Sequence, residues 1–277
     1  MAEYIKSFFS KVKKTGEESK EMSFMDHIDA LRKHLFRSAL YIAIGTTIMF
    51  LNKDFLFKYI VLGPLGEDFP TYKFFCNLSE FTCIKAPKPE IFTRELSEAL
   101  MIHLQASFFV GLFLVSPLVI NEIWKFVSPG LYDKEKRATK GIVVVLSGLF
   151  ILGVLFGFFV LAPFSISFLA SYQVSDLVKN SASLSSIVDA MFMFTFFTGI
   201  VFELPLAAYF LAKLGIMSPE FMKTYRRHAF LILAIVAAII TPPDVVSMTI
   251  VLIPLALLYE ASIIVVTRAY PKDLSNI

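Results

Sequence analysis

Long apolar runs constrain this chain more than any other feature of its sequence. Several stretches of about 20 residues carry almost no charge, and that is the length an α-helix needs to cross about 30 Å of hydrocarbon. The chain has 277 residues, of which 56% are hydrophobic and 18% charged, whereas a soluble domain is nearer half apolar and a quarter charged. The runs therefore predict an all-α integral membrane protein.

We expect six transmembrane helices in one membrane domain, residues 23–266. The last two are expected to be short, because the apolar run before the Thr-Pro-Pro-Asp turn at 241–244 is shorter than a bilayer is thick. Residues 1–22 are expected to be a basic, amphipathic N-terminal tail that lies as a helix on an anionic membrane face, with a partly disordered tail as the alternative. Residues 267–277 are expected to be a C-terminal tail. The expected spans are 35–52, 99–120, 141–162, 187–212, 228–241 and 245–266.

The basic residues predict the orientation of these spans. An even number of spans puts both termini on one side, and 19 of the 26 Lys and Arg residues fall on that side. By the positive-inside rule, both termini are expected to be cytoplasmic. The first 22 residues lack the long apolar core of a cleavable signal peptide. Because the basic residues lie at membrane edges, we expect no nucleic-acid partner.

The sequence gives little sign of an enzyme or a metal site. It contains no phosphate-binding loop, no H-E-x-x-H and no G-x-S-x-G. The four histidines are scattered, so we expect no metal and no cofactor. The two cysteines, Cys76 and Cys83, fall in the loop expected outside, where they could form a disulfide. Two free thiols are the alternative.

An acid and a proline interrupt the fourth apolar run. Glu203 lies about 15 Å along the helix from Lys213, near the bilayer centre, where a charge costs roughly 2.5–3.5 kcal/mol on insertion scales. Pro205 removes one backbone hydrogen bond and tends to bend the helix. Together they suggest a polar concavity within the membrane. A neutral acid that hydrogen-bonds to a neighbouring helix for packing alone is the alternative.

Two stretches on the cytoplasmic side mix charge with turn residues. The first, 126–137, reads FVSPGLYDKEKR; Asp133 is a plausible N-cap for the next helix, and a solvated helix start is the alternative. The second, 23–36, reads SFMDHIDALRKHLF. Asp29 and Arg32 share one face of this helix, and apolar residues share another, so seating at the membrane surface accounts for most of its pattern.

A small-xxx-small spacing occurs in the third apolar run. Residues 153–157 read GVLFG, and glycines at this spacing let two helix backbones approach closely. We expect this contact to lie within the chain. The polar stretch 52–98 is expected to be an irregular cap with short helices.

Five motifs in order resemble the TatC family, the multi-spanning core of the twin-arginine protein translocase. The family's H-L-x-E-L-R is similar to His27–Arg32, and its first cytoplasmic loop is similar to Phe126–Arg137. Its F-E-x-P is similar to Phe202–Pro205, and its T-P-P-D to Thr241–Asp244. Pro64 resembles the family's proline after the first span. One departure stands out, since Ala30 replaces the family's glutamate.

The resemblance implies a receptor in a bacterial cytoplasmic (inner) membrane. Its partners would be twin-arginine signal peptides of folded cargo, single-span TatA/TatB-type subunits, membrane lipid and further copies of the chain, with export driven by the proton gradient. Asp29 is expected to substitute for the missing acid at Ala30. The implied signal-peptide-binding residues are Glu135, Asp29, Arg137, Phe126 and Tyr132. The implied structural residues are Pro64, His27, Leu31, Arg32, Pro242, Pro243 and Asp244.

Two other functions remain open at this point. An ion-coupled transporter of a small solute could use Glu203 as its ion site. An intramembrane enzyme could use Glu203 and a histidine as acid and base. The receptor interpretation instead places an apolar groove for the signal peptide beside the bent fourth span.

Overall fold

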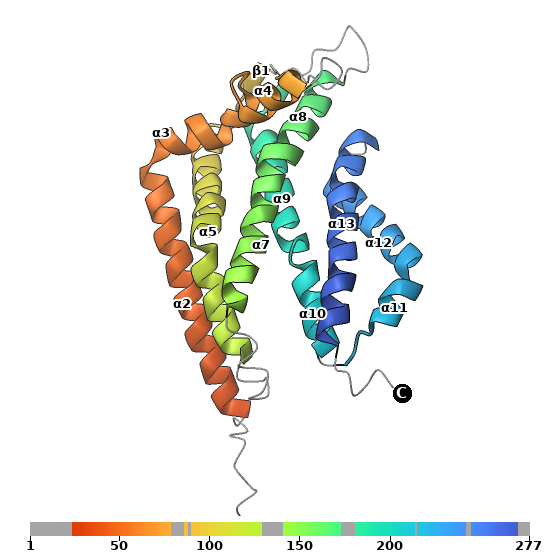
Figure 1. The fold of residues 1–277 in the computed structure, drawn as a ribbon. Helices are drawn as coiled ribbons and strands as arrows, with labels where there is room; N and C mark the ends of the chain where they lie inside the picture. Colours follow the sequence, from red (N-terminus) through yellow and green to blue (C-terminus); the bar gives the residue numbers. More distant parts are fainter. Residues whose placement is uncertain are drawn as a thin grey trace, which may run out of the picture.

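The computed structural model describes residues 24–78, 86–87, 90–128, 141–172, 181–213, 215–241 and 245–270. Long helices run side by side, and short elements cover one end (Figure 1). The expected tail 1–22 and most of the tail 267–277 lie outside the described residues. In chain order the elements are α2 (Phe24–Leu51), α3 (Lys53–Phe55), η1 (Leu56–Val61), η2 (Gly63–Leu65), α4 (Pro70–Leu78), β1 (Glu90–Phe92), α5 (Glu98–Val127), α7 (Ile142–Phe156), η5 (Gly157–Leu161), α8 (Ala162–Ser171), β2 (Ser181–Ser183), α9 (Leu184–Val201), α10 (Leu204–Lys213), α11 (Pro219–Thr224), α12 (Arg226–Ile240) and α13 (Val245–Ala269).

Five helical stretches in the described residues are long and apolar enough to cross a membrane. They are His27–Leu51, Glu98–Val127, Ile142–Ser171, Leu184–Lys213 and Ser247–Ala269. These correspond to five of the six expected spans. The expected span at 228–241 corresponds to α12, which has 15 residues and would reach only about 23 Å.

Several helix ends differ from those expected. The amphipathic segment and the first span form one continuous helix, α2, of 28 residues. The third stretch continues past 162 to Ser171, because Pro163 lies in the first turn of α8, where its missing N–H costs little. The π-helical turn η5 comes directly before it. The prediction that the last span is short was wrong, since α13 has 25 residues and includes Pro254.

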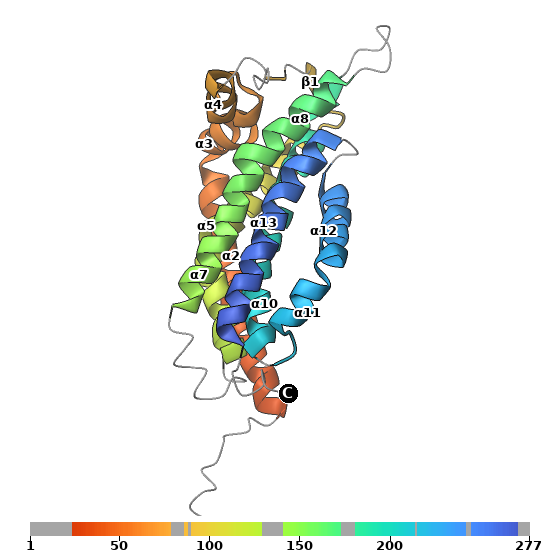
Figure 2. The ribbon, with the colours of Figure 1, turned by 45° about the vertical axis from the view of Figure 1, so that its right-hand side comes forward.

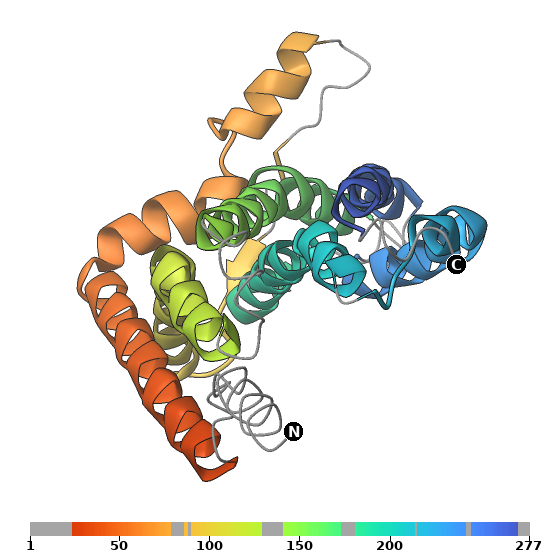
Figure 3. The same cartoon turned by 60° about the horizontal axis from the view of Figure 1, so that its bottom comes forward.

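Helices α2 and α5 form an antiparallel pair with close backbones (Figure 3). At their crossing, a Cβ added to Gly45 would lie 2.7 Å from the carbonyl oxygen of Gly111. A Cβ added to Gly111 would lie 2.5 Å from the backbone nitrogen of Thr46. Only glycine fits at this distance, so the two residues fix how the helices meet.

A second close seam joins α7 and η5 to α9. A Cβ on Gly153 would meet the backbone of Thr198 at 2.6 Å, and one on Gly157 would overlap the hydroxyl oxygen of Thr198. The Thr198 hydroxyl donates a hydrogen bond to the Gly153 carbonyl at 3.0 Å. The intramolecular contact expected of the GVLFG stretch is therefore confirmed.

Short elements cap the end where α2 finishes and α5 begins (Figure 1). They are α3, η1, η2, α4 and a two-stranded parallel sheet in which Glu90 of β1 pairs with Ser181 of β2. The sheet corrects the all-α expectation in detail, although each strand has three residues. The main buried cluster lies toward this capped end and includes Leu56, Ile102, Leu161, Met191 and Leu255.

Helix α13 packs against α10, and α11 and α12 pack against α13 (Figure 2). The Tyr259 hydroxyl of α13 donates to the Met222 carbonyl of α11 at 2.9 Å. Arg226 at the start of α12 forms a two-point ion pair with Glu260 of α13. These contacts attach the short α12 to the long α13. The Thr-Pro-Pro-Asp residues Pro242, Pro243 and Asp244 lie outside the described residues.

Candidate functional site

The end opposite the cap carries Asp29 and Phe126, the two residues expected to bind the signal peptide that the structure describes. We call this end the rim; it comprises the start of α2 (Phe24–Arg37), the end of α5 (Asn121–Val127), and the ends of α10 and α13 (Figure 1). At the rim, the ring of His27 on α2 stacks on Phe126 of α5, with ring centroids 4.5 Å apart. His27, expected to be structural, and Phe126, expected to bind the signal peptide, are thus in contact across the α2–α5 pair.

A buried carboxylate lies next to this stack, about one helical turn earlier on α5. Glu122 of α5 is 2% exposed, and its Oε2 is 2.7 Å from His34 Nδ1 of α2. Its Oε1 is 2.8 Å from the ammonium nitrogen of Lys125, and Arg37 Nη1 of α2 is 3.9 Å from Oε2. The carboxylate therefore connects two helices through three basic side chains, which supply the pairing that a buried charge requires.

Sequence reasoning missed Glu122. We expected the second span to end at residue 120, so Glu122 counted as part of a polar loop, whereas α5 continues to Val127. One signal was available: Glu122 stands between the apolar Ile120 and Ile123, three residues before Lys125, which is the spacing of an ion pair on one helix face.

The structure describes two of the five residues expected to bind the signal peptide, Asp29 and Phe126. Asp29 lies on α2 with an exposed side chain, while the adjacent Ala30 is partly buried. Glu135, Arg137 and Tyr132 lie outside the described residues. Of the residues expected to be structural, His27 makes the contact with α5, but Leu31 is 45% exposed and Arg32 is exposed. The side chains of Ile28, Leu31 and Leu35 form an exposed apolar stripe on α2.

Glu203 lies at a break between two helices, as the sequence indicated. Helix α9 ends at Val201 and α10 begins at Leu204, with Pro205 in its first turn, where its missing N–H costs little. Both carboxylate oxygens of Glu203 are buried and have no hydrogen-bond partner among the described residues. The preceding Phe202 is buried and stacks on Phe156 of α7, with ring centroids 5.7 Å apart.

Pro64 belongs to the cap, at the end of the molecule opposite the rim. It is buried in η2, and its carbonyl accepts a hydrogen bond of 2.8 Å from the Tyr72 hydroxyl of α4. The same hydroxyl is 3.5 Å from the Pro163 carbonyl of α8. Burial raises the pKa of Tyr72, so this hydroxyl remains a donor at neutral pH. Pro64 thereby helps to hold the cap against α8.

The cap also contains one of the two cysteines. Cys76 lies in α4 and is disulfide-bonded. The other cysteine of the chain, Cys83, lies outside the described residues. The Cys76–Cys83 pairing stays a prediction.

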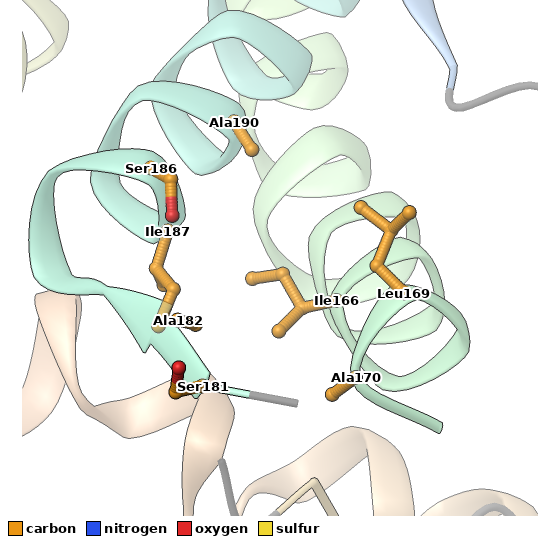
Figure 4. A pocket seen from close by; sticks show the side chains of 8 residues that line it. All are labelled: Ile166, Leu169, Ala170, Ser181, Ala182, Ser186, Ile187 and Ala190. Carbon is orange, nitrogen blue, oxygen red and sulfur yellow. The ribbon is translucent and has the colours of Figure 1, made fainter. Parts of the chain in front are cut away.

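A pocket of about 230 Å³ lies at the capped end between α8, β2 and α9 (Figure 4). Its lining is mostly aliphatic, with Ile166 and Leu169 from α8 facing Ile187 and Ala190 from α9. Neither Asp29 nor Phe126, the expected recognition residues that the structure describes, lines it. The pocket is therefore separate from both the rim and Glu203.

Comparison with known proteins places the chain in a family. Residues 26–254 match the family model described as Sec-independent protein translocase protein (TatC). The chain belongs to the TatC family. The TatC protein of Blattabacterium sp. subsp. Periplaneta americana (strain BPLAN) is 40% identical over 253 residues, which is 89% of this chain and 95% of that protein. TatCy of Bacillus subtilis (strain 168) is 31% identical over 252 residues, 91% of each chain.

A solved structure agrees with this assignment. A crystal structure of the twin-arginine translocase receptor TatC is 30% identical and superposes with a TM-score of 0.67, covering 88% of this chain and 99% of that one. This TatC-family member is accordingly a membrane protein of the Sec-independent, twin-arginine translocase. The matches favour this function over the solute-transporter alternative, and the family is a translocase family rather than an enzyme class.

Proposed function

We propose that this chain binds the twin-arginine signal peptides of folded proteins at the rim. The observation that carries the proposal is the likeness to a structure described as the twin-arginine translocase receptor, at 30% identity over 88% of this chain. A receptor for two adjacent guanidinium groups needs carboxylates that they can reach, because arginine forms paired, charge-assisted hydrogen bonds.

The recognition residues proposed are Glu135 and Asp29. Asp29 is exposed at the start of α2, and the segment that carries Glu135 follows directly from the end of α5. The stack of His27 on Phe126 fixes these two helix ends relative to one another. Arg137, Tyr132 and Phe126 complete the proposed site.

The apolar part of the signal peptide would then follow the membrane-facing helices. The exposed stripe of Ile28, Leu31 and Leu35 offers apolar contact next to Asp29. The interrupted α9–α10 pair, with the unpaired carboxyl of Glu203, would meet the deeper part of the peptide or a partner helix. An unpaired acid within the membrane is by default a functional group.

We further propose six spans in one membrane domain, residues 23–266, with both termini in the bacterial cytoplasm. Helix α12 would be the fifth span and α13 the sixth. The six residues of α11 lengthen α12 toward the rim, and a short span is accommodated when the bilayer thins locally. The charge bias of the loops supports this orientation. Reporter fusions after residues 218, 243 and 270 should report cytoplasm, outside and cytoplasm, respectively.

The partners follow from the proposed role. Single-span TatA/TatB-type subunits and further copies of this chain would assemble with it in the inner membrane, and the proton gradient would drive export. No catalytic step is assigned to the chain itself.

The direct test is peptide affinity. Full-length protein, purified in detergent, is titrated with a labelled peptide that carries an Arg-Arg pair and an apolar segment, and with the same peptide carrying Lys-Lys. We expect the Arg-Arg peptide to bind at least tenfold more tightly, because lysine cannot form the two-point contact. Glu135→Gln and Asp29→Asn should each reduce this preference.

The matched control is Asp54→Asn, which removes the same charge from α3 at the capped end. It should leave the affinity unchanged. Equal affinity of the wild-type protein for the two peptides would overturn the proposed function.

A further inference from the structure

Among the described residues, Glu122 is the carboxylate of the α2–α5 contact at the rim. Helix α2 places Asp29 on its exposed side and Ala30 on a partly buried side. His27 contacts Phe126 and His34 contacts Glu122. Position 30, an alanine, lies between these two histidines and carries no acid. The described carboxylate of this contact is therefore Glu122 of α5, which meets α2 at His34.

The two oxygens of Glu122 are held in different ways. Oε2 accepts from the ring of His34, which is 18% exposed and belongs to the other helix. Oε1 is paired with Lys125, which is 48% exposed and comes from the same helix, three residues on. Arg37 is 46% exposed and, at 3.9 Å from Oε2, is beyond hydrogen-bonding distance. Lys125 is thus the solvent-facing partner that covers one oxygen.

A half-exposed lysine is a replaceable partner. Its ammonium is strongly hydrated and loses little when it turns into solvent, and exposed pairs of this kind contribute weakly. A guanidinium donates through a planar fork and binds a carboxylate more tightly than an ammonium does. An arginine arriving at the rim would therefore displace Lys125 from Oε1, while His34 keeps the carboxylate oriented.

We propose that Glu122 is a recognition carboxylate for one signal-peptide arginine, and that Lys125 occupies it until the peptide arrives. The proposal rests on the proposed function, since it names a residue for the same site. It assigns Lys125 the role of an internal competitor. Removal of Lys125 should then strengthen peptide binding, whereas a purely structural ion pair predicts no such gain.

The experiment measures the affinity of the Arg-Arg and Lys-Lys peptides for the full-length protein and four variants. Lys125→Met should bind the Arg-Arg peptide about three- to tenfold more tightly, and Glu122→Gln about tenfold more weakly. In the double variant Glu122→Gln/Lys125→Met, the gain from Lys125→Met should vanish, because no carboxylate remains to be uncovered. The fourth variant, Lys33→Met, removes one exposed positive charge from the start of α2, which is also part of the rim. It measures the general effect of lower positive charge at the rim.

The outcomes separate the two proposals. If the wild-type protein does not prefer Arg-Arg, the proposed function fails. If it does, but Lys125→Met gains no more than Lys33→Met, the role of Glu122 in recognition is wrong. The same conclusion follows if the double variant keeps the gain. Should Glu122→Gln prove unfolded by thermal melting, the comparison of Lys125→Met with Lys33→Met still decides, because both variants keep the carboxylate.

Discussion

Two of the glutamates among the apolar helices of this protein, Glu122 and Glu203, have different surroundings. Glu122, near the end of α5, is 2% exposed and has both oxygens paired with basic side chains. Glu203, between α9 and α10, has both oxygens buried without a hydrogen bond among the described residues. An acid with partners connects helices, whereas a buried acid without them is retained only at a cost to stability. The comparison teaches that Glu122 contributes to the fold and that Glu203 is retained for another reason.

The largest expected effect comes from the helix contact beside Glu203. In Gly153→Leu, the new side chain would meet the backbone of Thr198 and the Cβ of Phe202, each within 3 Å. We expect a loss of about 3 kcal/mol or more in the free energy of unfolding, because α7 and α9 must separate. Thermal unfolding of the purified protein in detergent measures it.

The control for this change is on the same helix. Gly148 has nothing within 4 Å of an added Cβ, so Gly148→Leu should stay within about 0.5 kcal/mol of the wild type. If both variants have the same free energy of unfolding, the close contact of α7 with α9 beside Glu203 does not stabilise the fold.

The next effect concerns Glu122. Glu122→Ala should lower the free energy of unfolding by about 2 kcal/mol, because His34 loses its acceptor and Lys125 its ion pair. The loss stays below that of a fully buried pair, since Lys125 is about half exposed and can be hydrated. Chemical or thermal unfolding measures the change. A melting temperature equal to that of the wild type would contradict the role of Glu122 in joining α2 to α5.

A smaller effect is expected where the same two helices meet through rings. His27→Ala removes the stack on Phe126 and should cost about 0.5–1 kcal/mol. A larger loss than that of Glu122→Ala would show that the aromatic contact, rather than the carboxylate, fastens the rim.

The smallest effect on stability is expected at Glu203. Glu203→Gln removes no hydrogen bond that the described residues make, so the free energy of unfolding should change by less than about 0.5 kcal/mol. Export of a twin-arginine substrate in cells should nevertheless fall if the acid meets the peptide or a partner helix. A strongly destabilised protein would mean that Glu203 contributes to packing in the same way as Glu122.

The sequence by itself determined the membrane class, the order of the helices and the break at Glu203. Apolar runs of bilayer length predict spans directly, because backbone polar groups in hydrocarbon must be satisfied within a helix. The motifs from His27 to Asp244 also identified the family, which the comparisons confirmed. The ends of the helices were less predictable, since α5, α8 and α13 continue past the apolar runs from which the spans were predicted.

Only the tertiary structure decided which side chains meet. His34 and Glu122 are 88 residues apart, and their contact depends on the register of two antiparallel helices that Gly45 and Gly111 fix at close range. The parallel pairing of β1 with β2 likewise joins segments far apart in the chain. Hydrophobic length determines that a helix spans a membrane, but it does not set how far one helix slides along another. Backbone contact sets that register, and it places the carboxylate of Glu122 on α5 beside His34 of α2.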